Sequence, residues 1–362
     1  MKALLALLFA LLPLAWAQFA SGPNPAEVAR EAVEVWQTRA RAFDPFALAM
    51  TSPEAACREF AAIGQDPGLV AATRVNFDDL RELSRSEERI VYSYPSVTGV
   101  DTLGRVEVSL VRQGDLWQAE AVRLQLGGLQ VGLPGFLRHD ATGWLFILLT
   151  GYLVYLLARP SWLRRWLAEG WGVLKRFRGI VIATIIALYG VYGLGSWFGV
   201  TLPDCQLAVA TLAVGGLDSI GVVDVLQANN VPKLAAVITY WNFTQGTLLT
   251  TLIPAYLFAL PAYIINLGRF FVLGVALAPV GPLAALLPFH VPVIIIELLA
   301  YTLVTAGGAI FLVSFIREGL KGYRTAVRRL LLTVPIAFVL LVAGAWYESF
   351  AILRLIPAVA GP

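Results

Sequence analysis

Long apolar runs fill the second half of the chain and constrain its fold more than any other feature. A transmembrane helix needs about 20 predominantly apolar residues, and in lipid only helices and closed barrels satisfy every backbone hydrogen bond. The expected segments, the first starting near Thr142, are Trp144–Ala158, Gly179–Val200, Phe243–Ile265, Leu267–Leu287, Val291–Ile316 and Leu330–Phe350. The sequence therefore predicts an α-helical polytopic membrane bundle of about six transmembrane helices over residues 142–362.

The distribution of acidic residues divides the chain into two regions of different composition. Of its 24 Asp and Glu residues, 16 lie between Glu27 and Glu120, and only eight lie elsewhere. A Gly-rich stretch, Gly127 to Gly135, opens the linker predicted over residues 127–141. Residues 18–126 are therefore expected to form a small soluble domain ahead of the membrane bundle.

Helical and strand patterns follow one another in this soluble domain. Two helix starts, Asn24-Pro25-Ala26-Glu27 and Ser52-Pro53-Glu54, carry capping residues followed by Pro. Short β-branched runs begin at Arg89, and Arg112-Gln113-Gly114-Asp115 separates the last two as a hairpin turn. The pattern, ending in Gly114-Asp115-Leu116-Trp117, predicts an α+β cone and resembles the NTF2-like domains of the cell envelope.

The first residues predict export. Lys2 precedes an apolar stretch of about 14 residues, and Ala15-Trp16-Ala17 supplies a small-x-small cleavage site. We expect a signal peptide over residues 1–17 and a mature chain from Gln18, with an uncleaved anchor as the alternative. The domain at 18–126 would then lie outside the cytoplasm.

Basic residues in short loops give an orientation that agrees with export. The loops after the first and fifth segments are rich in them, whereas residues 201–241 contain only Lys233. We therefore expect an inner-membrane, multi-pass protein with its N-terminal domain and C-terminus extracytoplasmic. The basic residues are Arg159, Arg164, Arg165, Lys175, Arg176 and Arg178, then Arg317, Lys321, Arg324, Arg328 and Arg329.

The stretch 201–240 is too polar to cross easily. Asp204, Asp218 and Asp224 favour one or two amphipathic helices on the outer surface. The alternative makes Leu207–Val225 a seventh span, although two Asp residues inside it would cost roughly 2.5–3.5 kcal/mol each near the bilayer centre.

Few polar residues lie in the predicted bundle, and their order resembles a known family. Asn242, Asn266-Leu267-Gly268, His290, Glu297 to Tyr301, Gly307-Gly308 and the late Glu348 are similar to motifs of the stage II sporulation protein M family over residues 235–355. That resemblance implies an envelope membrane protein, because the family's sporulation member helps recruit a cell-wall-degrading complex.

Depth along the helices suggests a polar cluster of Asn242, Gln245, Glu297, Tyr301 and Glu348 in the outer leaflet. We expect Glu297 to point inward toward Glu348 and Asn242, since two neighbouring carboxyls in low dielectric do not both ionise. Either these residues form a hydrated pocket, or they make interhelical hydrogen bonds that stabilise the bundle by roughly 0.6–2 kcal/mol per contact. Arg269 is placed near the cytoplasmic face, with Glu318 as its partner.

Two function classes follow. The first is a non-enzymatic scaffold that holds other envelope proteins, with homo-oligomers allowed; the alternative is a transporter for a small molecule, ion or lipid. No nucleophile with a base and no metal-ligand set stands out, so no enzyme, cofactor or metal is predicted, and the absence of a basic stripe argues against nucleic acid. Cys57 and Cys205 would both face an oxidising compartment, where they either form a disulfide or stay separate.

Overall fold

The computed structural model describes residues 24–98, 102–126, 133–219, 222–257 and 259–357. The expected signal peptide and residues 127–132 of the linker lie outside these ranges. The chain divides into two compact units, Met1–Gln130 and Val131–Pro362, which are described separately below.

The first unit opens with helices that start at the capping residues of the sequence. The side chain of Asn24 accepts a hydrogen bond from the amide of Ala26, and Ser52 caps the next predicted start through the amide of Ala55. The helices are α2 (Pro25–Ala42), α3 (Pro45–Thr51), α4 (Pro53–Ile63) and α5 (Pro67–Ala72).

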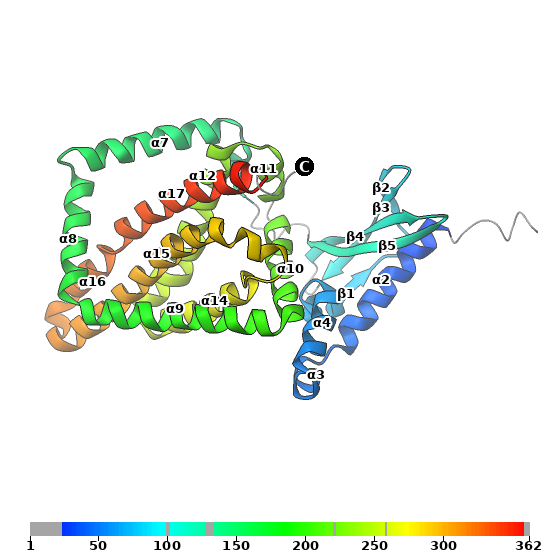
Figure 1. Cartoon of the computed structure of the whole chain (residues 1–362), viewed down its shortest axis with the longest axis horizontal. Helices are drawn as coiled ribbons and strands as arrows, with labels where there is room; N and C mark the ends of the chain where they lie inside the picture. Colours follow the sequence, from blue (N-terminus) through cyan, green and yellow to red (C-terminus); the bar gives the residue numbers. More distant parts are fainter. Residues whose placement is uncertain (1–23, 99–101, 127–132, 220–221, 258, 358–362) are drawn as a thin grey trace, which may run out of the picture. The chain divides into compact units, whose positions relative to one another are not determined.

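A curled antiparallel sheet completes this unit (Figure 1). Its strand order is β1-β3-β4-β5, and β2 pairs with β3. Trp36 of α2 packs into the core and donates from its indole nitrogen to the carbonyl of Ile63 at 2.8 Å. The strands are β1 (Thr73–Val75), β2 (Arg81–Arg85), β3 (Arg89–Thr98), β4 (Thr102–Gln113) and β5 (Leu116–Leu126). The first unit is thus an α+β region, as predicted.

The second unit is helical. Within the described residues four helices are long and apolar enough to cross a membrane, at Ala141–Ala158, Arg178–Thr201, Leu283–Glu318 and Leu320–Leu355, and Leu260–Ala276 is a shorter apolar helix. The chain is therefore a multi-pass membrane protein. The elements are α6 (Gly135–Arg138), α7 (Ala141–Ala158), α8 (Trp162–Arg176), α9 (Arg178–Thr201), α10 (Pro203–Ser219), α11 (Val222–Gln227), α12 (Val231–Trp241), the π-helix η1 (Asn242–Leu252), α13 (Ile253–Tyr256), α14 (Leu260–Ala276), α15 (Pro282–Glu318), the 3₁₀ turn η2 (Leu320–Gly322), α16 (Tyr323–Leu331), α17 (Val334–Phe350) and the π-helix η3 (Ala351–Leu355).

Two helices cross the ends of this bundle instead of running along it. In Figure 1, α8 closes one end, running across from α7 to α9, and α10 lies across the other end. Helix α8 exposes Trp162, Trp166 and Trp171 beside its basic residues, which is the composition of a helix at a membrane surface. Helix α10 is not among the helices long and apolar enough to span.

The middle of the unit departs from the predicted segments. The expected third segment, Phe243–Ile265, is divided, because α13 ends at Tyr256 and α14 starts at Leu260 with Pro261 in its first turn; Ala259, directly before α14, has a φ of 68°. The expected fourth and fifth segments change likewise, because α14 ends at Ala276 and one helix, α15, runs from Pro282 to Glu318. Pro favours the first turn of a helix, so Pro261 and Pro282 mark helix starts that lie inside the expected third and fourth segments.

The two basic loops lie together at one end of the bundle. Arg328 of α16 pairs with Glu169 of α8 at 2.6 Å, and Arg329 lies over the Phe177 ring. At the other end, Lys233 at the start of α12 pairs with Asp140 before α7 at 3.0 Å. The two basic loops thus lie at the same end of the bundle, and the orientation of that end toward the cytoplasm stays a prediction.

Candidate functional site

Glu297 and Tyr301 lie one turn apart on α15, and the tyrosine hydroxyl donates to the Glu297 carboxylate at 3.0 Å. Tyr301 is buried against η1 at Gly246, where an added Cβ would lie 2.6 Å from the tyrosine ring. Only glycine therefore lets η1 approach the ring this closely.

Arg269 of α14 completes this cluster and was placed wrongly by the sequence analysis. Its guanidinium donates to the carbonyl of Gly246 at 3.1 Å and to the hydroxyl of Thr250 at 2.7 Å, and it lies 4.8 Å from the centroid of the Tyr301 ring. It also interacts electrostatically with Glu297. The expected partner, Glu318, instead pairs with Arg329 at 2.7 Å.

The correction has a geometric cause. Because α14 starts at Leu260 and not at Leu267, Arg269 lies nine residues into its helix, about 14 Å from the start at 1.5 Å per residue. Likewise α15 starts at Pro282 and not at Val291, the start of the expected fifth segment, so Glu297 lies 15 residues from that end of its helix instead of six. The cluster therefore lies nearer the middle of the bundle than predicted.

Glu348 of α17 faces the same region. It interacts electrostatically with Glu297 and with Tyr301. Both carboxyl residues are partly exposed, as are Asn242 and Gln245 of η1. The backbone carbonyl of Gln245 accepts a hydrogen bond from Thr250, the residue that also holds Arg269. The structure thus joins Glu297, Tyr301 and Glu348 with Arg269, Gly246 and Thr250, which the sequence analysis did not select.

The family-motif positions have separate places. Asn266 is fully buried and donates to Thr251 and to the carbonyl of Ala262, and His290 contacts the carbonyl of Leu286 at 3.0 Å. A Cβ at Gly307 or Gly308 would lie 2.8 Å from Thr333 or Ala255, so both glycines mark close helix contacts, whereas Gly268 is exposed. Asn266, Gly307 and Gly308 thus lie at contacts between segments, and Gly268 and His290 do not.

Three buried hydroxyl groups lie in α12, η1 and α17. Thr239, Thr247 and Ser349 have no hydrogen-bond partner within the described part of the chain. A buried hydroxyl without a partner costs roughly 1–3 kcal/mol in mutational data, so these groups are suited to binding water or a polar solute. Ser349 adjoins Glu348, and Thr247 adjoins Gly246.

The charges outside the spans have local roles. Lys233 Nζ donates to the Asp140 carboxylate and holds the pKa of that carboxyl below its usual range. His139 accepts at Nδ1 from the amide of Ala141. Among the described residues no three His, Cys, Asp or Glu side chains gather as metal ligands. Neither Cys57 nor Cys205 is a free thiol.

The chain matches no protein-family model, no curated protein and no solved structure. The geometry and charges of the site are therefore the basis for assigning a function.

Proposed function

We propose that the membrane unit is a transport path in which Glu348, in a cluster with Glu297 and Arg269, binds a proton or another small monovalent cation that couples to solute movement. The carrying observation is that three ionisable side chains from α14, α15 and α17 meet inside a bundle of apolar helices. Such residues are costly in a membrane and mark ion pathways and proton relays. Neutral polar groups would serve for packing alone.

The charge count supports a cation. One guanidinium and two carboxylates leave one negative charge in the cluster, and a bound proton or monovalent cation neutralises it. Arg269 interacts electrostatically with Glu297, whereas the groups that interact with Glu348 within the described residues are Glu297 and Tyr301. We therefore assign Glu348 as the residue that binds and releases the cation.

The backbone around the cluster supports movement. The π-helix η1 carries Gly246 and Thr250, which accept hydrogen bonds from Arg269, and π-helical segments are frequent at functional sites. In this proposal α7, α9, α12 to α13, α14, α15 and α17 make six crossings, with the basic end in the cytoplasm. We also propose that the membrane unit is related to the stage II sporulation protein M family, which it resembles in the order of its polar motifs.

The test uses purified full-length protein and needs no known solute. Infrared difference spectra, in which a protonated carboxyl has its own C=O band, are recorded between two pH values and with Na⁺ exchanged for choline. We expect a carboxyl band that responds to pH or to Na⁺ and disappears in Glu348→Gln. Glu318→Gln, at the basic end, is the matched control and should keep the band. A carboxyl spectrum that responds to neither cation would refute the cation site.

A second candidate is the scaffold role, favoured by a groove on the first unit. A cavity of about 670 Å³ lies between α2, α3 and α4, with Val35 53% exposed in its wall. Its charged residues are Glu31, Glu34 and Glu59, with Arg39, which pairs with Glu59, as the one basic residue. An exposed apolar residue within an acidic rim suits a basic segment of a partner protein. A photo-reactive residue at position 35 should crosslink that partner in cells, and Glu34→Lys should abolish the crosslink while Glu87→Lys, outside the groove, leaves it.

A further inference from the structure

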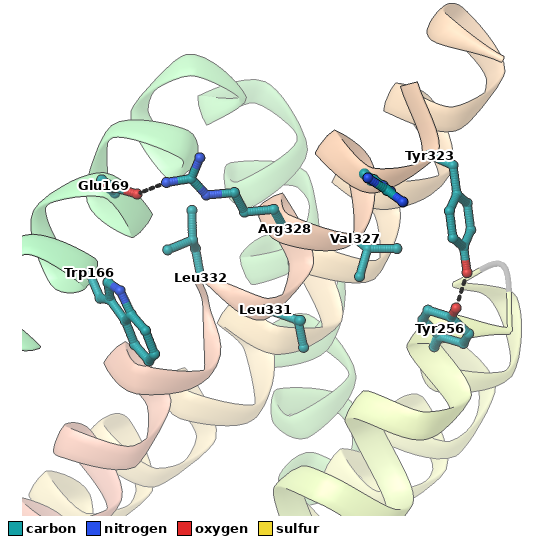
Figure 2. A pocket seen from close by; sticks show the side chains of 9 residues that line it. Trp166, Glu169, Tyr256, Tyr323, Val327, Arg328, Leu331 and Leu332 are labelled. Carbon is teal, nitrogen blue, oxygen red and sulfur yellow. Dashed lines mark hydrogen bonds and ion pairs between the residues drawn. The ribbon is translucent and has the colours of Figure 1, made fainter. Parts of the chain in front are cut away.

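A cavity of about 440 Å³ lies at the basic end of the membrane unit, away from the charged cluster. Figure 2 shows its walls, which come from three elements: Trp166 of α8, Tyr256 of α13, and Tyr323, Val327 and Leu331 of α16. The hydroxyls of Tyr256 and Tyr323 are hydrogen-bonded to each other across one side. The cavity therefore joins segments that are far apart in the sequence.

Its charge is positive. Arg324 and Arg328 both line it, with Glu169 as the one acidic residue of the lining. Glu169 pairs with Arg328 at 2.6 Å, whereas Arg324 forms no ion pair within the described ranges. One guanidinium is thus available for an anion, and the second is shared with a carboxylate.

The remaining wall is apolar and lies where lipid headgroups are expected. Trp166 is 49% exposed and Leu331 is 50% exposed, and the ring of Trp162 packs against that of Trp166 on α8. Tryptophan and tyrosine side chains gather at the boundary between hydrocarbon and water, and basic pockets between transmembrane helices bind anionic headgroups. A soluble anion would leave this apolar wall uncovered.

We propose that this cavity binds one anionic phospholipid, with its phosphate at Arg324 and Arg328 and an acyl chain along Trp166, Val327 and Leu331. The bound lipid would link α8 to α16, the two segments that form the basic end. The site is independent of the proposed transport function, because none of its residues belongs to the charged cluster.

The experiment titrates the detergent-purified full chain with phosphatidylglycerol and, separately, with phosphatidylcholine of the same acyl chains, and counts bound lipids by native mass spectrometry. We expect tighter binding of phosphatidylglycerol. Arg324→Gln should weaken it about fivefold, since a basic residue near an anionic headgroup contributes about 1 kcal/mol. Arg164→Gln, an exposed basic residue of α8 outside the cavity lining, is the matched control and should change nothing.

A variant with the opposite sign sharpens the test. Glu169→Gln frees Arg328 from its ion pair and should tighten phosphatidylglycerol binding about fivefold, with thermal unfolding as the check on folding. Equal affinity for the two lipids, or equal effects of Arg324→Gln and Arg164→Gln, would overturn the proposal. Binding of inorganic phosphate alone that Arg324→Gln abolishes would also overturn it, in favour of a soluble phosphate ligand.

Discussion

Charged residues are used differently in the two units of the chain. In the first unit several ion pairs join near neighbours in the sequence on exposed surface, as in Arg30–Glu34, Arg81–Asp79 and Arg85–Glu82. In the membrane unit the charged side chains connect separate elements, as Arg269 connects α14 to η1 and α15 and Arg328 connects α16 to α8. Removing a charge from the membrane unit is therefore expected to disturb the arrangement of its helices. Removing most charges of the first unit is not expected to disturb its fold.

The largest expected effect comes from removing the charge of Arg269. Arg269→Met leaves the Gly246 carbonyl, the Thr250 hydroxyl and Glu297 without their cationic partner, and breaking such a pair inside a protein costs about 3–5 kcal/mol. Because Arg269 is partly exposed, we expect about 3 kcal/mol, measured as thermal unfolding in detergent. Arg81→Met on the first unit should cause no measurable change.

Coupling to Glu297 gives a second measurement on the same residue. If the two charges interact, Glu297→Gln should cost less in the Arg269→Met background than in the wild type. Strictly additive effects of the two substitutions would show that Arg269 acts only on the η1 backbone. A loss of stability in Arg269→Met no larger than in Arg81→Met would remove the contrast between the units.

Close contacts between helices in the membrane unit also depend on glycine. Positive φ occurs at glycines of both units, at Gly64 and Gly114 and at Gly281 and Gly319. Gly195 of α9 and Gly274 of α14 have a different role, since they allow two membrane helices to touch. An added Cβ at Gly195 would lie 2.2 Å from the carbonyl oxygen of Phe271.

Gly195→Val should therefore destabilise the membrane unit by about 3 kcal/mol, near the upper end of what overpacking usually costs. Gly193→Val is the matched control on the same helix, because nothing lies within 4 Å of a Cβ there. Comparable yields and melting temperatures for the two variants would contradict the observed crossing of α9 and α14.

The sequence predicts those parts of the fold that depend on local chemistry. The caps at Asn24 and Ser52 and the hairpin turn at Gly114 are confirmed, since each depends on residues within a few positions of one another. The apolar composition of the bundle likewise predicts helices that can span a membrane. The family resemblance, the signal peptide and the role of the polar cluster stay predictions.

The helix bounds that the sequence did not predict depend on where the chain reverses direction within a long apolar stretch. Hydropathy sums composition over a window, so it does not locate a reversal inside one long apolar stretch such as 243–287. The position of Pro261 in the first turn of α14 was the available signal, and it would have placed Arg269 in mid-helix. The contact between Gly246 and Tyr301 involves residues 55 positions apart, which no local pattern reports.

A covalent link would limit the separation of the two units. We expect Cys57 and Cys205 to form a disulfide, so protein alkylated before lysis should carry no label at either position and change mobility only on reduction. Its removal by Cys57→Ala should cost about 2 kcal/mol, the lower end of the usual range, because the bridge joins units that each have their own core. Two alkylated thiols with unchanged mobility would rule the bridge out.

The smallest expected effect concerns the ion pair at the end of the bundle opposite the basic loops. Lys233 is only 6% exposed, and its ammonium donates to Asp140 at 3.0 Å, connecting the start of α12 to the start of α7. The hydrogen bond and the charge of Lys233 lower the pKa of Asp140 in the folded protein. A carboxyl with a lowered folded pKa stabilises the fold above its unfolded pKa of about 3.9, and this contribution is lost as the pH falls further through the folded pKa.

Thermal unfolding of the wild type and of Asp140→Asn should therefore differ at neutral pH and converge below about pH 4. Asp115→Asn, in the hairpin of the first unit, should leave the pH dependence of the membrane unit unchanged. Parallel curves for the wild type and Asp140→Asn down to acid pH would show that this pair does not connect α7 to α12 in solution.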